Sequence, residues 1–448
     1  MQNPNTLWIK HPLATLSPAY AGGLVITGNR IAELVPAGQI PKTPIDEVFD
    51  ASQHVLLPGL INAHHHFYQT LTRAHPVALN KALFSWLTSL YPVWAGLRPE
   101  MVEVSTQIAL AELLLSGCST ASDHHYLFPQ GLEDAIDIQV AQAQQLGVRV
   151  HLTRGSMSLG KEQGGLPPQS TVQSEDVIMA DSERLIRRYH DSRDGAMIRV
   201  ALAPCSPFSV STELMRMSAE LAEKHQVQLH THLAETHDET AFCQKMFGMR
   251  PVDYLESVGW LSNRVWLAHG IHFNEEEIGR LGQAGVGIAH CPSSNMLLAS
   301  GQCPTLELEA AGCPVGIGVD GSASNDGSNM ITEVRQALLL QRLRYGAEKI
   351  THQKVLDWAT RGSARCLGRD DIGDIAVGKQ ADLALFRLDD IRFAGAGDPL
   401  AALILCGAQR ADRMMVAGRW RVTDGAVCGL DIEALKARQR ELAAQLVV

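Results

Sequence analysis

The sequence predicts an α/β protein, a (β/α)8 TIM-like barrel with a small β-sandwich domain formed from the N- and C-terminal segments. Three observations predict this fold. From Gly59 onward, short apolar runs alternate with amphipathic segments of helical length, eight times in all. Both ends of the chain instead carry strand patterns. Polar residues that can hold a metal follow several of the apolar runs, where the active sites of such barrels lie.

The barrel strands are predicted where a short apolar run is bounded by turn residues. These runs lie at 59–64, 119–124, 148–153, 197–203, 227–232, 264–268, 286–290 and 314–319. The helices between them are predicted from apolar residues that recur with helical spacing. The clearest examples are Pro99–Ser116, Glu133–Leu146, Ser211–His225, Asn274–Ala284 and Met330–Tyr345.

The small domain is predicted from strand patterns at both ends of the chain. Near the N-terminus, Gly23–Thr27 and Arg30–Val35 flank Gly28-Asn29, a two-residue signal for a hairpin turn. After the last barrel helix, the pattern returns to strands at Ala381–Phe386 and Met414–Val422. Because the N-terminal segment is too small to stand alone, we expect the two groups of strands to share one domain.

The expected domain boundaries follow from this change of pattern. The composite β-domain takes residues 1–58 and 370–448, and it ends in an amphipathic helix at Asp431–Val447. The barrel takes residues 59–369. No internal repeat of fixed period and no low-complexity segment interrupts either part, so two domains account for the whole chain.

Composition and charge exclude two classes of partner. The chain has 448 residues, of which 46% are hydrophobic, enough for a large core. Its formal net charge of −10 argues against a nucleic-acid partner, whose phosphates need a basic face. Because the sequence has neither a signal-peptide pattern nor an apolar run of membrane-spanning length, we expect a soluble, cytoplasmic protein. The nine cysteines include no CxxC pair, which fits reduced thiols.

The stretch Pro58–His66 contains the first candidate for metal binding. A Pro-Gly turn signal follows the apolar run His54–Leu57, so the histidines are expected where a buried strand gives way to a loop. Successive strand side chains point to opposite faces, which places His64 and His66 on one side. Taken alone, this pair is explained equally well as a polar strand end.

Three further strand ends carry side chains of the same kind. The fifth strand ends in His230, His232 and Glu235, the sixth in His269 and the eighth in Asp320. The carboxyl ends of barrel strands meet at one face, so these side chains should converge with those of the first strand. Three imidazoles and one carboxylate suit zinc or a neighbouring first-row metal, with one position left for water. Four consistent strand ends together predict a metal site.

This set of strand ends resembles the amidohydrolase superfamily, whose barrel carries HxH on strand one, histidines on strands five and six, and an aspartate on strand eight. The resemblance covers essentially the whole chain. Its PGLIN-A-HxH and HLAE stretches resemble the branch that deaminates purines, pterins and triazines. The resemblance implies that the metal ligands are His64, His66, His232 and Asp320. It also implies that Glu235 is the proton shuttle and that His269 is a second-sphere catalyst.

The resemblance implies a metal-dependent aminohydrolase that acts on C–N bonds in cyclic amidines. Many amidohydrolases bridge two metals with a strand-four lysine, and Ile198–Cys205 contains none, so we expect one divalent metal per chain, zinc or else iron. Glu235 lies just past a ligand, where a carboxylate can touch the metal-bound water and reach a ring nitrogen as a general acid/base. Asp320 would also be catalytic, because it would accept the second proton of the water.

The substrate is suggested by further motifs. Over its full length, with HHHFYQTLTRA, SDHHYLFP, TRGSMSLG and APCSPFS, the chain resembles bacterial 8-oxoguanine deaminases. This implies conversion of 8-oxoguanine to urate and ammonia by attack of a metal-activated water at C2. Gln69 stands where guanine deaminases carry a glutamine that reads the purine edge, although a loop-capping role also explains it. Guanine deaminases place an arginine where this chain has Cys205, which disfavours plain guanine.

Other candidate substrate contacts have a structural explanation as well. The ring of Trp86 could stack on a planar base or anchor its own loop-helix segment. No acidic residue stands in Leu83–Trp86 to hold ribose hydroxyls, so a free base is favoured over a nucleoside. His125, Arg154 and Cys205 lie at the ends of strands two, three and four, where some residues only hold loops.

Three alternatives remain open at the level of sequence. A guanine or isoguanine-type deaminase, or an s-triazine hydrolase, would use the same scaffold and the same metal residues. A non-enzymatic assembly protein on this barrel is disfavoured, because relatives of that type lose metal ligands and this chain keeps them. We expect a small purine as the substrate, neither nucleic acid nor membrane as a partner, and a homo-oligomer.

Overall fold

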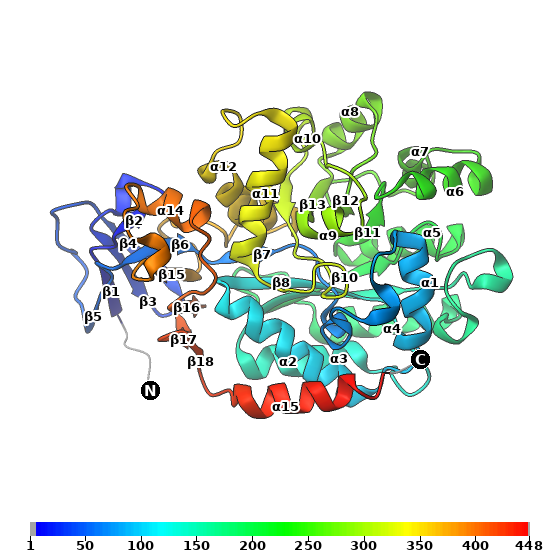
Figure 1. Cartoon of the computed structure of the whole chain (residues 1–448), viewed down its shortest axis with the longest axis horizontal. Helices are drawn as coiled ribbons and strands as arrows, with labels where there is room; N and C mark the ends of the chain where they lie inside the picture. Colours follow the sequence, from blue (N-terminus) through cyan, green and yellow to red (C-terminus); the bar gives the residue numbers. More distant parts are fainter. Residues whose placement is uncertain (1–5, 447–448) are drawn as a thin grey trace.

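The computed structural model describes residues 6–446 and contains a barrel of eight parallel strands (Figure 1). The strands are Leu60–Asn62 (β7), Cys118–His125 (β8), Arg149–Ser156 (β9), Ile198–Pro204 (β10), Leu229–Leu233 (β11), Val265–His269 (β12), Gly287–His290 (β13) and Val315–Ile317 (β14). Each strand pairs with its neighbour in sequence. Backbone hydrogen bonds from Ala63 N to Ile317 O (2.9 Å) and from Asp320 N to His64 O (3.0 Å) close the ring. The predicted barrel is confirmed.

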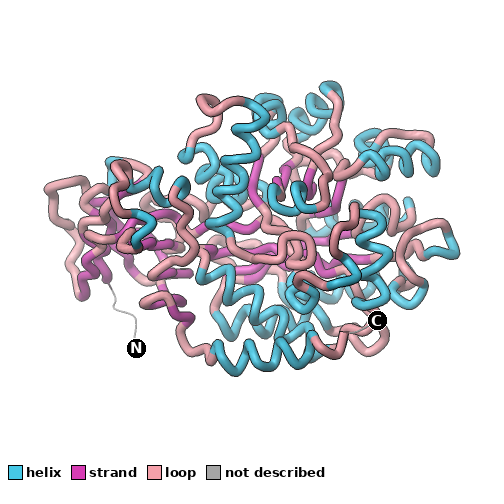
Figure 2. Tube along the Cα trace, in the orientation of Figure 1, coloured by secondary structure: helices cyan, strands magenta, loops and turns pink. Residues whose placement is uncertain are grey.

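Helices surround the strands (Figure 2). They are Leu83–Trp94 (α1), Pro99–Leu115 (α2), Ala135–Leu146 (α3), Glu175–Tyr189 (α4), Thr212–His225 (α5), His237–Phe247 (α6), Pro251–Ser257 (α7), Glu275–Ala284 (α8), Pro292–Leu297 (α9), Thr305–Ala311 (α10), Met330–Tyr345 (α11), His352–Asp357 (α12), Ser363–Cys366 (α13), Pro399–Leu405 (α14) and Ile432–Ala443 (α15). The five predicted barrel helices are present as α2, α3, α5, α8 and α11. Helix α1 was not predicted, because it lies outside the strand-helix alternation.

The small domain consists of two sheets, ordered β4-β3-β1-β5 and β18-β17-β16-β15-β6-β2. Its strands are Thr6–Lys10 (β1), Ala14–Thr15 (β2), Gly23–Thr27 (β3), Arg30–Val35 (β4), Glu47–Asp50 (β5), His54–Pro58 (β6), Leu383–Arg387 (β15), Arg413–Val416 (β16), Arg419–Thr423 (β17) and Ala426–Val427 (β18). Ile9 and Leu24 from one sheet pack in the same buried cluster as Leu385 and Met415 from the other. This packing confirms the predicted sandwich, and the boundaries at 58/59 and 369/370 stay a proposal.

One predicted strand of the small domain was wrong. The sequence predicted a single strand at Met414–Val422, and the structure forms the antiparallel hairpin β16–β17 instead. Ala417 and Gly418 stand at the turn with φ of 49° and 72°. Two successive residues at positive φ reverse the chain within a two-residue loop, which the apolar pattern on either side concealed.

Helix α15 is the predicted C-terminal helix. It begins shortly after β18 of the β-sandwich and runs along α2 at the edge of the barrel (Figure 1). The predicted helix extended to Val447, which lies outside the described residues. Across residues 6–446, no helix combines the length and the apolar character that a membrane crossing requires.

A buried ion pair joins the barrel to the small domain. The guanidinium of Arg149, at the start of β9, donates to both carboxylate oxygens of Asp382 at 3.0 and 3.1 Å. Both side chains are almost fully inaccessible to solvent. Arg149 also donates to the carbonyls of Gly195 and Ala196, while Asp382 accepts from Ala417 N at 2.7 Å. Both charges are therefore fully hydrogen-bonded across the domain boundary.

We predict that Arg149→Met destabilises the protein strongly, because it leaves the carboxylate of Asp382 buried without its cation. Breaking one side of a buried pair costs about 3–5 kcal/mol. Urea denaturation followed by fluorescence measures the loss. Arg193→Met is the matched control, since Arg193 pairs with Asp191 at the surface and such pairs contribute about 0–1 kcal/mol. Equal denaturation midpoints for the two variants would contradict this role.

Candidate active site

Side chains from four strand ends converge at the carboxyl end of the barrel. Nε2 of His64 and Nε2 of His66 lie 3.3 and 3.4 Å from Oδ1 of Asp320. Nε2 of His66 also lies 3.2 Å from Nε2 of His232. His64 and His66 follow β7, His232 belongs to β11, and Asp320 follows β14. These are the side chains that the sequence placed at strand ends, and the structure brings them together.

The hydrogen bonds of His66 and His232 fix where each ring carries its proton. Nδ1 of His66 lies 2.7 Å from the carbonyl oxygen of His124, and Nδ1 of His232 lies 2.7 Å from that of Cys205. A carbonyl oxygen can only accept, so both Nδ1 atoms carry hydrogen. Burial lowers the pKa of each ring to about 3, so both rings are neutral. Each Nε2 atom therefore carries a lone pair, and the two lone pairs point toward each other.

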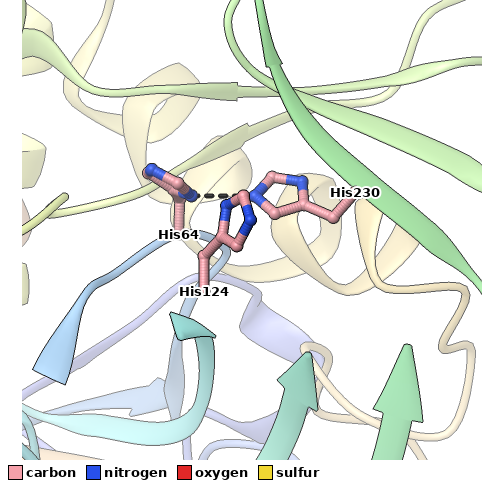
Figure 3. Close-up of side chains that lie close together, drawn as sticks. All are labelled: His64, His124 and His230. Carbon is pink, nitrogen blue, oxygen red and sulfur yellow. Dashed lines mark hydrogen bonds between the residues drawn. The ribbon is translucent and has the colours of Figure 1, made fainter. Parts of the chain in front are cut away.

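His230 fixes the proton of His64 in the same way (Figure 3). Nδ1 of His230 donates to the carbonyl oxygen of Trp266 at 2.7 Å, which leaves a lone pair on its Nε2. That Nε2 lies 2.8 Å from Nδ1 of His64, so His64 must be the donor. Nε2 of His64 then carries a lone pair. This atom is buried and has no hydrogen-bond partner among the described residues.

These four side chains fit a metal cation. Three lone pairs and a carboxylate oxygen point at one another with no proton between them, an arrangement that is repulsive without a positive charge. Burial alone would raise the pKa of Asp320, but the nearby His64 holds it well below its usual range, so the carboxylate is ionised. Three neutral imidazoles and one carboxylate form a donor set that zinc and similar divalent metals accept.

A second group of imidazoles does not offer the same donor set. His64, His124 and His230 also lie close together (Figure 3). His64 and His230 already share a proton between them, and Nε2 of His124 is 2.9 Å from the carbonyl oxygen of Ala203. The ring of His124 stacks on that of His232, with centroids 4.8 Å apart. His124 and His230 therefore lie beside the four converging side chains, where they contact His64 and His232 and hold their rings in place.

Glu235 and His269 form a proton-exchanging pair beside the four converging side chains. Nε2 of His269 lies 3.4 Å from Oε2 of Glu235 and 3.9 Å from Oδ2 of Asp320. Burial raises the pKa of Glu235 to about 7. Burial opposes the charged form of His269, but the carboxylates of Glu235 and Asp320 outweigh it and raise its pKa. A carboxyl with a pKa of about 7, such as that of Glu235, can hold or release a proton near neutrality.

The turn that carries Glu235 is held by a carboxylate that the sequence analysis missed. Glu239, in the first turn of α6, accepts from Ala234 N at 2.8 Å and from Glu235 N at 3.1 Å. Ala234 has a φ of 53°, a left-handed conformation that costs free energy in a residue with a side chain. Glu239 is fully buried. It therefore stabilises a strained turn, and only its spacing after Glu235 could have indicated this.

A cavity opens beside these groups. Its walls combine polar residues of the strand ends with apolar and aromatic residues of α1 and the β10–α5 loop. They are His66, Gln69, Leu83, Trp86, Leu87, Tyr91, Tyr126, Cys205, Phe208, His232, Glu235, His269, Leu298, Asp320 and Ser324. Sequence reasoning missed Leu87 and Tyr91, because nothing in the alternation predicted that α1 faces the strand ends. It also missed four wall residues outside the helices of the alternation, which are Tyr126, Phe208, Leu298 and Ser324.

Three of the predicted substrate contacts line this cavity. Gln69 lies against Gly321, where an added Cβ would come within 1.9 Å of its Oε1. Trp86 donates from Nε1 to the carbonyl oxygen of Ala323 at 3.1 Å, so its ring is held in place. Sγ of Cys205 lies 4.0 Å from Nδ1 of His232, and burial raises the pKa of the thiol to about 12. The thiol therefore stays protonated.

The comparisons with known proteins agree with this geometry. The model of the amidohydrolase family matches residues 55–421. The chain belongs to the amidohydrolase family. This amidohydrolase is 66% identical to the 8-oxoguanine deaminase of Pseudomonas aeruginosa, over 98% of this chain and 99% of that one. It is 36% identical to an isoxanthopterin deaminase from an unknown prokaryotic organism, over 92% and 89% of the two chains.

A solved structure shares the fold of this amidohydrolase over its whole length. The atrazine chlorohydrolase TrzN from Arthrobacter aurescens TC1, complexed with zinc, is 33% identical and superposes with a TM-score of 0.92. The match covers 98% of this chain and 100% of that one. The present chain is therefore an enzyme, a hydrolase of the amidohydrolase family.

Two predicted substrate contacts of this amidohydrolase do not line the cavity. Arg154 donates from Nε to Asp181 at 2.7 Å, and its guanidinium stacks 3.8 Å from the ring centroid of Phe128. Nε2 of His125 lies 2.7 Å from the carbonyl oxygen of Leu127. The two residues are register partners on β8 and β9, so strand alternation turns both toward the surrounding helices. Their contacts with Leu127 and Phe128, in the loop after β8, fit the alternative interpretation that they hold loops.

We predict that His230→Phe weakens metal binding, because His64 loses the acceptor that fixes its proton and its ring orientation. Loss of such an outer hydrogen bond typically costs about 10-fold to 100-fold in metal affinity. Competition with a chromophoric chelator measures the zinc dissociation constant of the metal-free protein.

His230→Gln should recover part of this affinity, since its amide oxygen can take the place of Nε2 as an acceptor. His290→Phe is the matched control, because His290 is a buried strand-end histidine that contacts Gln341 rather than the converging side chains. Unchanged affinity in His230→Phe would show that His64 needs no such partner.

Proposed function

We propose that this enzyme is a hydrolytic deaminase of a free purine base, with 8-oxoguanine as the substrate and urate and ammonia as the products. The observation that carries the proposal is the 66% identity to an 8-oxoguanine deaminase over 98% of the chain. The cavity supports it, because it joins proton-transferring groups to flat aromatic walls. The bond that breaks is the C–N bond between C2 and its exocyclic amine.

One divalent metal per chain belongs to this proposal, zinc first and iron second. His64, His66, His232 and Asp320 would hold it, since their lone pairs converge. When bound, such a metal lowers the pKa of a water molecule and so supplies a nucleophile at neutral pH. A single ion is favoured because the neighbouring imidazole group is already hydrogen-bonded and because β10 contains no lysine to bridge two ions.

Glu235 would act as the general acid/base. Burial raises the pKa of its carboxyl to about 7, so Oε2 can take a proton from the nucleophilic water and deliver it to the ring nitrogen next to C2. His269 would stabilise the charge that develops on the attacking oxygen through its Nε2, which already lies 3.4 Å from Glu235. Nδ1 of His269 is held by Asn295 at 2.9 Å, which fixes the ring.

The two oxygens of Asp320 would have separate roles. Oδ1 faces the imidazoles and accepts from Gly321 N at 2.7 Å. Oδ2 faces His269 and Ser324 at distances of 3.9 and 3.3 Å. Oδ1 would therefore help hold the metal, while Oδ2 accepts the second proton and passes it to the departing amine.

The cavity walls would orient the base. The held ring of Trp86 offers a flat surface for stacking. Gln69 would read a polar edge of the purine, because both of its present contacts, to Tyr68 and Ala323, are long. Cys205 would contact the imidazole half of the base. Arg154 and His125 are not assigned to substrate binding, since both are engaged outside the cavity.

A guanine or isoguanine-type deaminase is the second candidate, because each would remove an exocyclic amine from a purine ring, guanine at C2 and isoguanine at C6. A triazine hydrolase is a weaker candidate, since two relatives that act on triazines are 38% and 33% identical to this chain, against 66% for the 8-oxoguanine deaminase. We also infer a cytoplasmic location, which the nine free cysteines support, and a homo-oligomeric state stays a prediction from the sequence.

The proposal is tested by the purified enzyme with its metal content measured. We expect deamination of 8-oxoguanine with a higher kcat/KM than for guanine, isoguanine, isoxanthopterin, adenosine or a chlorotriazine. Ammonia release and the ultraviolet spectrum of urate follow the reaction. A clear preference for guanine would move the enzyme to the second candidate, and activity on triazines alone would overturn the purine assignment.

We predict that Glu235→Gln keeps one equivalent of metal but loses turnover. The amide can accept a hydrogen bond, but it cannot carry a proton to the ring, and general acid/base catalysis typically contributes about 100-fold to 10,000-fold. Metal analysis and kcat for 8-oxoguanine measure the two effects. Glu220→Gln, on the exposed face of α5, is the matched control. A metal-loaded Glu235→Gln protein with kcat near that of the parent would refute the role.

A further inference from the structure

Tyr91 brings an unpaired hydroxyl to the cavity wall. It belongs to α1, lines the cavity and is 1% exposed. Its hydroxyl is buried and has no hydrogen-bond partner among residues 6–446. The other tyrosine of the wall, Tyr126, differs because its hydroxyl interacts with that of Tyr68. Buried hydroxyls without partners are rare in folded proteins, so this one requires an explanation.

The rest of the wall from α1 offers no competing polar atom. Leu83 and Leu87 are apolar, and the indole nitrogen of Trp86 is already engaged with Ala323. Burial keeps the pKa of Tyr91 well above 10, so its hydroxyl retains the proton and can donate. A ligand that rests against α1 therefore meets one strong donor in an otherwise apolar surface. Such a donor favours ligands that present an acceptor at this position.

Tyr91 and the reacting groups come from different parts of the cavity wall. Glu235, His269 and Asp320 lie at the ends of barrel strands, whereas Tyr91 belongs to α1. In a purine, C2 and C8 lie at opposite ends of the long axis of the ring system. If C2 reacts beside Glu235, the C8 end is the part of the base that is free to contact the wall from α1.

We propose that Tyr91 is a specificity-determining residue, whose hydroxyl donates a hydrogen bond to the oxygen on C8 of 8-oxoguanine. This inference rests on the proposed function. Guanine carries only hydrogen at C8, so it leaves the hydroxyl buried and unpaired. A site with a buried donor discriminates against an analogue that lacks the acceptor. Tyr91 thus supplies the contact that the thiol of Cys205, a weak donor, cannot supply.

The test compares Tyr91→Phe with the parent enzyme on two substrates. Phenylalanine keeps the ring and the packing of α1 but removes the hydroxyl. We expect kcat/KM for 8-oxoguanine to fall about 10-fold, mainly through KM, while kcat/KM for guanine changes by less than about 2-fold. The preference for 8-oxoguanine over guanine should therefore narrow by about the same factor of 10.

Binding without turnover provides an independent readout. In the metal-loaded Glu235→Gln background, calorimetry gives dissociation constants for 8-oxoguanine and guanine with and without Tyr91→Phe. The added substitution should weaken binding of 8-oxoguanine about 10-fold and leave that of guanine nearly unchanged. Tyr254→Phe is the matched control, because Tyr254 is equally buried but lies in α7 outside the cavity. Its substrate preference should equal that of the parent.

The outcomes separate this inference from the proposed function. If the parent prefers 8-oxoguanine and Tyr91→Phe keeps the same preference, Tyr91 does not read the C8 oxygen and only this inference fails. An equal fall for both substrates likewise overturns it, since that result indicates a packing role for Tyr91. If the parent deaminates no 8-oxoguanine, the proposed function fails and this inference fails with it.

Discussion

The active site depends on backbone carbonyls that fix the protons of the buried histidines. A carbonyl cannot donate, so an imidazole whose Nδ1 contacts one must direct a lone pair from Nε2. Residues on or directly after the barrel strands supply this contact three times. The carbonyl oxygens of His124, Cys205 and Trp266 accept from Nδ1 of His66, His232 and His230, in that order. Because the strand backbone is rigid, the orientation of these lone pairs follows from the fold itself.

Buried carboxylates hold the loops that follow the strands. Asp123 accepts from Phe67 N at 2.6 Å, Glu239 from the turn of Glu235, and Glu333 from Ser293 N at 2.8 Å. Burial raises the pKa of each of the three acids to about 7. A buried carboxylate in such a position stabilises the loop by accepting hydrogen bonds from backbone amides. The same amides would cost free energy if they were buried without a partner. These acids therefore position the reacting groups without touching the cavity.

The sequence predicted the elements that repeat and missed those that stand outside the repeat. All eight barrel strands could be placed because each is a short apolar run with turn residues around it. The converging histidines could be placed because strand ends meet at one face. Helix α1 could not, since nothing local indicates that it covers that face. The sequence also did not show which side chains of β8 and β9 point into the barrel. For this reason Arg154 and His125 were assigned to a pocket that they do not line.

The cavity therefore has two parts with different structural origins. One part is built from strand ends, where His64, His66 and His232 are hydrogen-bonded to residues on or next to other strands, so a substitution there disturbs several partners at once. Another part of the wall comes from α1, which lies outside the barrel alternation and contributes Trp86 and Tyr91. Residues in that wall can change without altering the proton arrangement at the strand ends. Under the role proposed for Tyr91, such a division would let one set of strand-end groups serve different flat heterocycles, with the choice among them made by α1.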